Sequence, residues 1–147
     1  MVMVLYNYKV LPTNFCDYLI NLYETNAGNH ERVDIDSKPT FTQLNLNKYH
    51  TNVVSNLCNY FLVALDFYKK DVPQAKYLPQ FKYLEEFRIK KYEVGGQDRF
   101  DEHVDVVNYQ SSKRSLAMLF YLNDVVSGGK TIFPYQNKEF TPSRGEV

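Results

Sequence analysis

Residues 87–107 read FRIKKYEVGGQDRFDEHVDVV, and this stretch decides the fold class of the chain. Apolar and polar residues alternate at its start, the period-2 pattern typical of a β-strand. Gly95-Gly96 then predicts a turn or bulge, and a second strand is predicted over Phe100–Val107. Because side chains alternate between the two faces of a strand, His103 and Asp105 should lie on the same face.

His103 and Asp105 are therefore a candidate metal-binding pair. An imidazole and a carboxylate on one face supply two of the three protein ligands of a 2-His-1-carboxylate iron(II) site, which leaves positions open for substrate and O₂. The other histidines, His30 and His50, precede the strand region, and we expect neither to be a ligand. Two interpretations stay open: the chain is a piece of a longer oxygenase, or the pair is simply two polar residues on a surface strand.

Helical patterns precede this strand region. A short strand is predicted over residues 3–10, and Pro12-Thr13-Asn14 opens a helix with one apolar stripe, formed by Phe15, Tyr18, Leu19, Leu22 and Tyr23. Residues 27–46 are polar and irregular, with a strand near Thr40–Leu44. A second amphipathic helix is predicted from about Asn47 to Lys70.

Further strands follow the metal pair. Arg114–Leu122 carries apolar residues on both faces, which is typical of a strand inside a sandwich. Thr131–Phe133 is predicted as a short strand, and another segment begins at Phe140. Two helices followed by regularly spaced strands predict an α+β fold: a double-stranded β-helix (a jelly-roll, cupin-like) with N-terminal supporting helices.

Composition limits the partners and the compartment. The chain has 147 residues, 44% of them hydrophobic, and 17 basic residues balance 17 acidic ones. A neutral chain creates no field that would draw it to nucleic acid or to an anionic membrane, and we expect neither partner. Cys16 and Cys58 are expected to be buried free thiols, which fits a reducing compartment. With neither a signal peptide nor an apolar run long enough to span a bilayer, the expected location is cytoplasmic, in a cell or an infected host.

A longer string of motifs surrounds the metal pair. It starts with Tyr92, Gly96-Gln97, Phe100 and the His-x-Asp triplet, and it continues through Arg114, Tyr121-Leu122-Asn123-Asp124-Val125, Gly128-Gly129-Lys130-Thr131-Ile132-Phe133-Pro134 and Phe140-Thr141-Pro142-Ser143-Arg144-Gly145. In order and spacing, this string resembles the prolyl 4-hydroxylase group of 2-oxoglutarate oxygenases. The resemblance spans about Phe87 to Gly145.

The resemblance implies an activity and its site. It implies an Fe(II)- and 2-oxoglutarate-dependent dioxygenase that hydroxylates a C–H bond with O₂, with ascorbate as a plausible reductant. His103 and Asp105 match the family's metal ligands. Tyr92 matches a tyrosine that lines the 2-oxoglutarate pocket, and Tyr121 matches one whose hydroxyl bonds the distal carboxylate of that co-substrate. The implied substrate is a peptidyl proline or another protein side chain, ahead of a free amino acid.

The sequence also departs from the family pattern. The family's distal histidine, and the Lys or Arg that follows it, would fall beyond Val147. We therefore expect residues 1–147 to be a single oxygenase domain, incomplete at its C-terminus, with mainly helical support over 1–80 and jelly-roll strands over 81–147. Such a chain should bind iron poorly and turn over little. The alternative is a non-catalytic jelly-roll module with a binding or structural role, while a cupin-like hydrolase or isomerase would need more histidines.

Overall fold

The computed structural model describes residues 7–147 and mixes helices with antiparallel strands. The helices are α1 (Thr13–Glu24), α2 (Leu46–Tyr49) and α3 (Thr51–Asp71). The strands are β1 (Glu31–Ile35), β2 (Lys38–Asn45), β3 (Arg88–Lys91), β4 (Thr131–Phe133) and β5 (Lys138–Phe140), and short 3₁₀ helices lie at Ala27–Asn29, Pro73–Tyr77, Ser111–Lys113 and Pro134–Gln136. The α+β class predicted from the sequence is confirmed.

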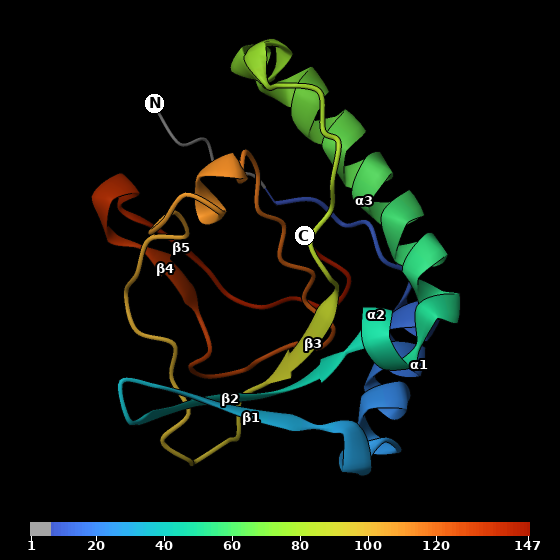
Figure 1. Cartoon of the computed structure of the whole chain (residues 1–147), viewed down its shortest axis with the longest axis vertical. Coiled ribbons are helices and arrows are strands. Elements are labelled where there is room, and N and C mark those ends of the chain that lie inside the picture. Colours follow the sequence, from blue (N-terminus) through green and yellow to red (C-terminus); the bar gives the residue numbers. More distant parts are fainter. Residues whose placement is uncertain (1–6) are drawn as a thin grey trace.

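The helices pack against one face of the larger sheet. This sheet is antiparallel in the order β1-β2-β3, and Leu44 of β2 lies opposite Ile89 of β3. Both side chains join the core, whose buried members are Leu19, Tyr23, Leu44, Leu46, Val53 and Leu57. In Figure 1, α3 runs along one side of the molecule and the β4–β5 hairpin lies on the opposite side. The apolar stripes of α1 and α3 are therefore buried against this sheet.

The other face of the same sheet carries different side chains. Gln43 of β2 pairs with Lys90 of β3, so alternation places Phe41, Gln43 and Lys90 opposite to Leu44 and Ile89. The bulge between β1 and β2 falls before Phe41, so it leaves this alternation intact. This second face supports the candidate site.

Both predicted helices are confirmed, with changes at their ends. The second one is broken at His50, which separates α2 from α3. The Asn45 side chain accepts a hydrogen bond from the Lys48 backbone N–H, so α2 has its own N-cap. The strand predicted near Thr40–Leu44 is confirmed within β2. β1 was not predicted, because its mixed polar residues form a strand only by pairing with β2.

Two of the predicted strands are wrong. Phe100–Val107 and Arg114–Leu122 lie in irregular backbone. In the second segment Tyr121 exchanges backbone hydrogen bonds with the chain end: its N–H donates to the Glu146 carbonyl at 2.8 Å, and the Gly145 N–H donates to the Tyr121 carbonyl at 2.8 Å. An alternating sequence favours extended backbone, but a ladder also needs a neighbouring strand in register, and the period alone does not reveal that neighbour.

The remaining strands form a small second sheet. β4 coincides with the predicted Thr131–Phe133 strand and pairs with β5, which ends at Phe140. Within residues 7–147 the strands make one three-stranded and one two-stranded sheet, and they do not close into a double-stranded β-helix. Residues 3–6 of the strand predicted over 3–10 lie outside the described residues, and in its described part Lys9 makes an isolated bridge to Glu146.

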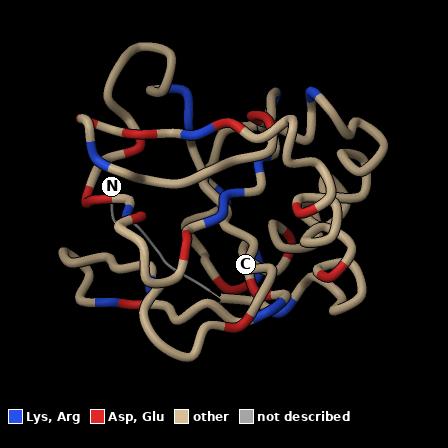
Figure 2. Tube along the Cα trace, turned by 90° about the horizontal axis from the view of Figure 1, so that it is seen from below, with Lys and Arg blue, Asp and Glu red and all other residues tan. Residues whose placement is uncertain are grey.

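Charged side chains are spread over the whole trace. Figure 2 shows Lys and Arg interleaved with Asp and Glu along the described chain, as expected for 17 residues of each sign. Across the described residues, no helix combines the length and the apolar character needed to cross a membrane.

Candidate metal centre

The loop that carries the metal pair is fastened to the first sheet by ion pairs. Arg32 of β1 binds Asp98 with a nitrogen–oxygen distance of 2.6 Å, and Lys38 of β2 binds Asp101 at 2.9 Å. Asp98 also accepts a hydrogen bond from the Glu93 backbone N–H at 3.1 Å. The Arg32 guanidinium therefore lowers the pKa of Asp98. These contacts hold the backbone just before His103 against β1 and β2.

His103 is oriented by two contacts. Its Nδ1 lies 2.8 Å from the Asp101 carbonyl oxygen, and its ring stacks on Phe100 with ring centres 3.9 Å apart. A carbonyl oxygen can only accept, so Nδ1 must carry the proton in this hydrogen bond. In the neutral ring, Nε2 is then left with a lone pair, the form in which histidine binds metals.

Asp105 faces this lone pair. Its Oδ1 lies 3.4 Å from His103 Nε2, and the two side chains are 53% and 43% exposed. Two acceptor atoms at this distance repel each other unless a cation or a proton lies between them. Ligands at right angles on a metal with bonds of about 2.1 Å would be about 3.0 Å apart, so the two atoms would have to move about 0.4 Å closer to bind one ion in this way. The structure thus brings together the predicted metal pair.

Arg114 supports the backbone of Asp105. Its Nη1 donates to the Asp105 carbonyl oxygen at 2.7 Å, while its Nε and Nη2 bind the carboxylate of Glu85 at 2.6 and 3.0 Å. A two-point arginine–carboxylate pair fixes direction as well as distance. The hydrogen bonds from Arg114 lower the pKa of Glu85. Arg114 was recognised in the motif string but without a role, because its contacts to 85 and 105 depend on tertiary folding.

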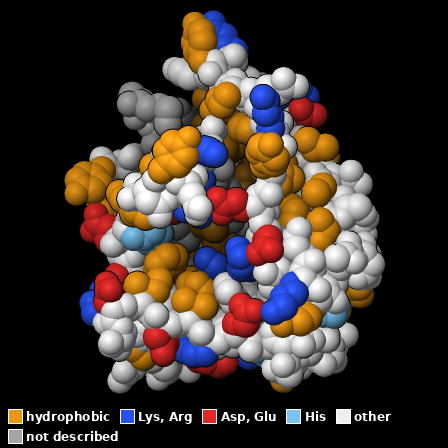
Figure 3. Space-filling model, viewed as in Figure 1, with side chains coloured by type: hydrophobic (Ala, Val, Ile, Leu, Met, Phe, Trp, Pro, Cys, Tyr) orange, Lys and Arg blue, Asp and Glu red, His pale blue; other side chains and the backbone are white. Residues whose placement is uncertain are grey.

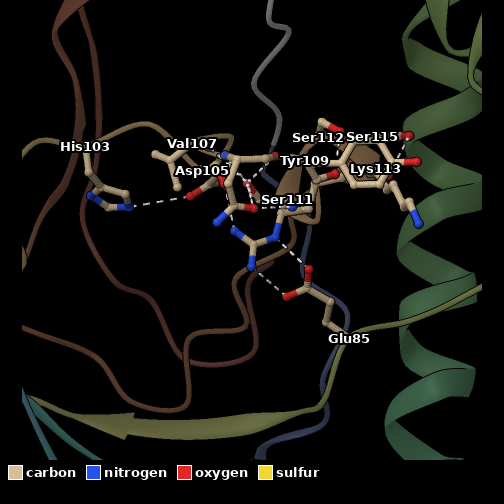
Figure 4. A network of polar contacts seen from close by, with 11 residues as sticks. Glu85, His103, Asp105, Val107, Tyr109, Ser111, Ser112, Lys113 and Ser115 are labelled. Carbon is tan, nitrogen blue, oxygen red and sulfur yellow. Dashed lines mark hydrogen bonds and ion pairs between the residues drawn. The ribbon is translucent and has the colours of Figure 1, made fainter.

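A polar turn closes the same loop. The Ser111 hydroxyl accepts hydrogen bonds from the backbone N–H groups of Val107 and Asn108, at 2.9 and 3.0 Å. The Ser111 N–H in turn donates to the Asn108 side chain at 2.9 Å. Ser111 is buried, at 7% exposure, so these bonds satisfy its polar groups away from water. The turn directs the chain from Asp105 back to Arg114 (Figure 4).

Aromatic rings and one lysine line the sheet side of the site. Phe41 packs edge-on against both Tyr92 and Phe100, with ring centres 5.7 Å apart in each case. Lys90 Nζ lies 4.4 Å from the Phe41 ring centre and 5.4 Å from that of Phe100. On the face shown in Figure 3, acidic and basic side chains gather around a hollow near the centre of the molecule. Tyr92 and Phe100 thus pack on the same Phe41 ring, and Phe100 in turn stacks on His103.

Burial affects both titratable groups of this lining. Burial raises the pKa of Tyr92, and the nearby Asp98 raises it further. Burial lowers the pKa of Lys90, and the positive charge of Arg88 lowers it further. The negative charge of Asp105 raises it. Lys90 was missed by the sequence analysis. The alternation of side chains along a strand could have predicted it, because Lys90 precedes Tyr92 by two residues and so shares its face.

Tyr121 occupies a different place from the metal pair. Its hydroxyl donates to Thr131 Oγ1 at 2.7 Å, and both residues line a cavity of about 110 Å³. Leu116, Met118, Phe133 and Phe140 are among the apolar side chains around it, and α3 contributes Ala64 and Tyr68. His103 and Asp105 are not among the lining residues. Thr131, part of a recognised motif but without a predicted role, is the partner that the structure adds.

A third metal ligand is not found within residues 7–147, where no group of three or more His, Cys, Asp or Glu side chains could hold an ion. His30 Nε2 lies 2.8 Å from the Tyr23 carbonyl oxygen and its ring stacks on Tyr23. His50 lies between α2 and α3 with its Nε2 buried and without a hydrogen-bond partner. The donor set present, one imidazole and one carboxylate, fits part of an iron(II) site.

Comparison with known proteins links this chain to a hydroxylase. Over 79 residues it is 40% identical to a protein of Arabidopsis thaliana named "Probable prolyl 4-hydroxylase 9". The match covers 50% of this chain and 26% of that protein, so the chain spans about a quarter of the length of this relative. No family model matches the chain, and no solved structure matches it significantly. The resemblance to prolyl 4-hydroxylases is thus confirmed over half of the chain.

Proposed function

We propose that this protein contributes to an Fe(II)- and 2-oxoglutarate-dependent dioxygenase that hydroxylates a C–H bond, in the manner of prolyl 4-hydroxylases. The observation that carries the proposal is the meeting of two acceptor atoms, His103 Nε2 and Asp105 Oδ1, at 3.4 Å. A cation between them turns a repulsive contact into a favourable one. The similarity to a prolyl 4-hydroxylase over half of the chain supports iron(II) as that cation.

The reaction divides one O₂ between two products. One oxygen atom enters 2-oxoglutarate, which leaves as succinate and CO₂, and the other enters the substrate as a hydroxyl group. Bound iron(II) supplies the oxygen chemistry, and the protein supplies ligands and orientation. His103 and Asp105 hold the metal, while Arg114 positions Asp105 through its backbone carbonyl. Ascorbate would act as the reductant, on the resemblance alone.

The two predicted tyrosines take co-substrate roles in this proposal. The Tyr121 hydroxyl donates to Thr131 in one cavity, and in this proposal it turns to donate to a carboxylate of 2-oxoglutarate when the co-substrate binds. Tyr92 lines the approach to the metal pair beside Phe41. The partly exposed rings of Tyr92 and Phe100, which both pack on the buried Phe41, would offer an apolar surface to a peptidyl proline, the substrate class that the relative's name points to.

The jelly-roll architecture is part of the same proposal. Residues 1–80 would provide the helical support and residues 81–147 the strands that carry the site. The α+β class and the two antiparallel sheets support this assignment. The extended segment at Tyr121, already bonded to Gly145 and Glu146, is where further ladder pairing would form.

A non-catalytic binding module is the second candidate function. It is favoured by the two-residue donor set within the described chain and by the exposure of both residues, 43% for His103 and 53% for Asp105. In this case a proton replaces the metal, and the pair is a surface ion pair between a charged imidazole and a carboxylate. Such pairs contribute little to stability, ~0–1 kcal/mol.

Metal titration separates the two candidates. Calorimetric titration with Mn(II), a redox-stable substitute for Fe(II), should show weak two-ligand binding to the wild type that His103→Ala and Asp105→Ala each abolish. Loss of a ligand should exceed the roughly 10–100-fold effect of losing a residue that only orients a ligand. His30→Ala is the matched control and should leave the affinity unchanged. Equal Mn(II) affinity in His103→Ala and wild type would refute the metal site and favour the non-catalytic module. Turnover is tested separately, by measuring succinate formation from 2-oxoglutarate.

A further inference from the structure

Lys90 and Lys91 are neighbours on β3 with opposite surroundings. Lys91 lies 3.1 Å from Glu24 and 3.3 Å from Glu93, so its charge is matched by two carboxylates. Lys90 points to the other face of the sheet and has no carboxylate within ion-pair distance among the described residues. Its ammonium group instead lies over the rings of Phe41 and Phe100.

The other cations of this region are already paired. Arg114 binds Glu85, and Arg88 binds Glu86. The acid whose charge acts on Lys90 is Asp105. If Asp105 binds a metal ion, as proposed above, the ion neutralises the Asp105 carboxylate, which then no longer balances the charge of Lys90. Lys90 then remains as an unmatched positive charge beside a site that itself carries a cation.

The position of Lys90 brings this charge to the metal pair. The Phe100 ring contacts both the Lys90 ammonium, 5.4 Å from its centre, and the stacked ring of His103, with ring centres 3.9 Å apart. Both aromatic contacts are made by the ammonium nitrogen, which can also donate hydrogen bonds to a carboxylate. Lys90 and His103 are both exposed, so a ligand can reach them.

We propose that Lys90 binds a carboxylate of the ligand that occupies the metal site. Two sources supply this chemistry: a dicarboxylate co-substrate such as 2-oxoglutarate, and an acidic side chain next to the target residue of a peptide. The inference rests on the proposed function, since it assigns Lys90 to the same site. It adds a binding residue that neither the motif string nor the similarity to a prolyl 4-hydroxylase singled out.

Charge-removal variants test the proposal. Lys90→Met keeps the aliphatic stem over the rings and removes the charge, Lys90→Arg keeps the charge, and Lys91→Met removes the same charge on the opposite face. Each protein is titrated with 2-oxoglutarate, and with two proline-containing peptides that differ by Glu or Gln beside the proline, in the presence and absence of Mn(II). Lys90→Met should weaken one carboxylate ligand by about tenfold or more. Lys91→Met should bind as wild type, and Lys90→Arg should recover most of the affinity.

The arms of the experiment identify the source and separate the two proposals. A loss confined to 2-oxoglutarate assigns the co-substrate, and a loss confined to the Glu peptide assigns the substrate. Unchanged affinity of Lys90→Met for both ligands overturns the inference, and a fall in thermal stability alone shows that Lys90 only packs on Phe41 and Phe100. Failure of the wild type to bind Mn(II) would count against the proposed function. The metal-free titrations still test Lys90, because an ion pair with a carboxylate does not need the metal.

Discussion

Residues 11–75 and residues 76–147 are held in place by different forces. The buried hydrophobic side chains of the described chain all lie between Leu11 and Ala75. After Ala75 the buried positions are Ser111 and Gly145, neither of which contributes a large apolar side chain. The second region contributes only partly buried side chains to the core, Phe87, Ile89 and Leu122, and its loop over residues 93–103 is also fastened by charged contacts from Arg32 and Lys38.

This difference bears on the candidate site. His103, Asp105 and Arg114 all lie in irregular backbone of the region with little apolar burial, whereas Phe41 and Lys90 lie on the paired strands β2 and β3. Segments with few buried apolar contacts open more easily than a core does. We infer that the metal pair lies on a locally weak loop whose geometry depends on polar contacts to a stable sheet.

The largest expected effect compares the same substitution in the two regions. Leu44→Ala removes a side chain that is 0% exposed, and it should lower the free energy of unfolding by about 2–5 kcal/mol. Leu119→Ala removes one that is 54% exposed, and it should change stability by less than about 0.5 kcal/mol. Urea denaturation followed by circular dichroism measures both. Equal losses in the two variants would show that residues 76–147 have an apolar core of their own.

A second test asks whether the weak region binds ligand. Under the proposed function, Tyr121→Phe removes a donor to a carboxylate, which should weaken 2-oxoglutarate binding by about 1.5–3 kcal/mol. Calorimetric titration of the Mn(II)-loaded protein measures the affinity. Tyr135→Phe is the control, because Tyr135 is 91% exposed. Unchanged affinity with reduced stability would make Tyr121 a packing residue that only bonds Thr131.

A third test breaks a contact between the regions. Arg32→Met removes the guanidinium that binds Asp98 and should loosen the loop that leads to His103. Hydrogen–deuterium exchange should then speed up over residues 93–103, while α1 and α3 keep their protection. Arg99→Met is a matched control, since the Arg99 side chain is 80% exposed. Uniform exchange across the chain would contradict the idea of a separately anchored loop.

The smallest effect depends on pH. Arg114 lowers the pKa of Glu85, so the folded protein holds the Glu85 proton less tightly than the unfolded chain does. The stabilisation is therefore fully present above the ordinary glutamate pKa of 4.5 and is lost as the pH falls through the lowered value. Because Glu85 is 62% exposed, Glu85→Gln should cost only ~0.2–1 kcal/mol at pH 7. The difference in free energy of unfolding between wild type and Glu85→Gln should be smaller at pH 3 than at pH 7. An equal difference at both pH values would be evidence against the ion pair between Arg114 and Glu85.

Local patterns determined the helices and the metal pair. The helical spacing of apolar residues predicted α1 and the α2–α3 segment, because periodicity reflects which face a helix buries. The His-x-Asp spacing keeps His103 and Asp105 close along the chain, and their side chains lie 3.4 Å apart. This held although the predicted strand over Phe100–Val107 did not form.

Tertiary structure alone decided which segments pair and what surrounds the site. β1 forms because β2 lies beside it, whereas Arg114–Leu122 has the strand pattern without a full ladder. The contacts of Arg114 with Glu85 and Asp105 join residues that are 29 and 9 positions apart in the sequence. Lys90 on β3 contacts Phe41 on the neighbouring strand β2. The physical reason is that ladders, ion pairs and ring contacts need two partners placed by the whole fold, whereas periodicity and side-chain parity are properties of a single segment.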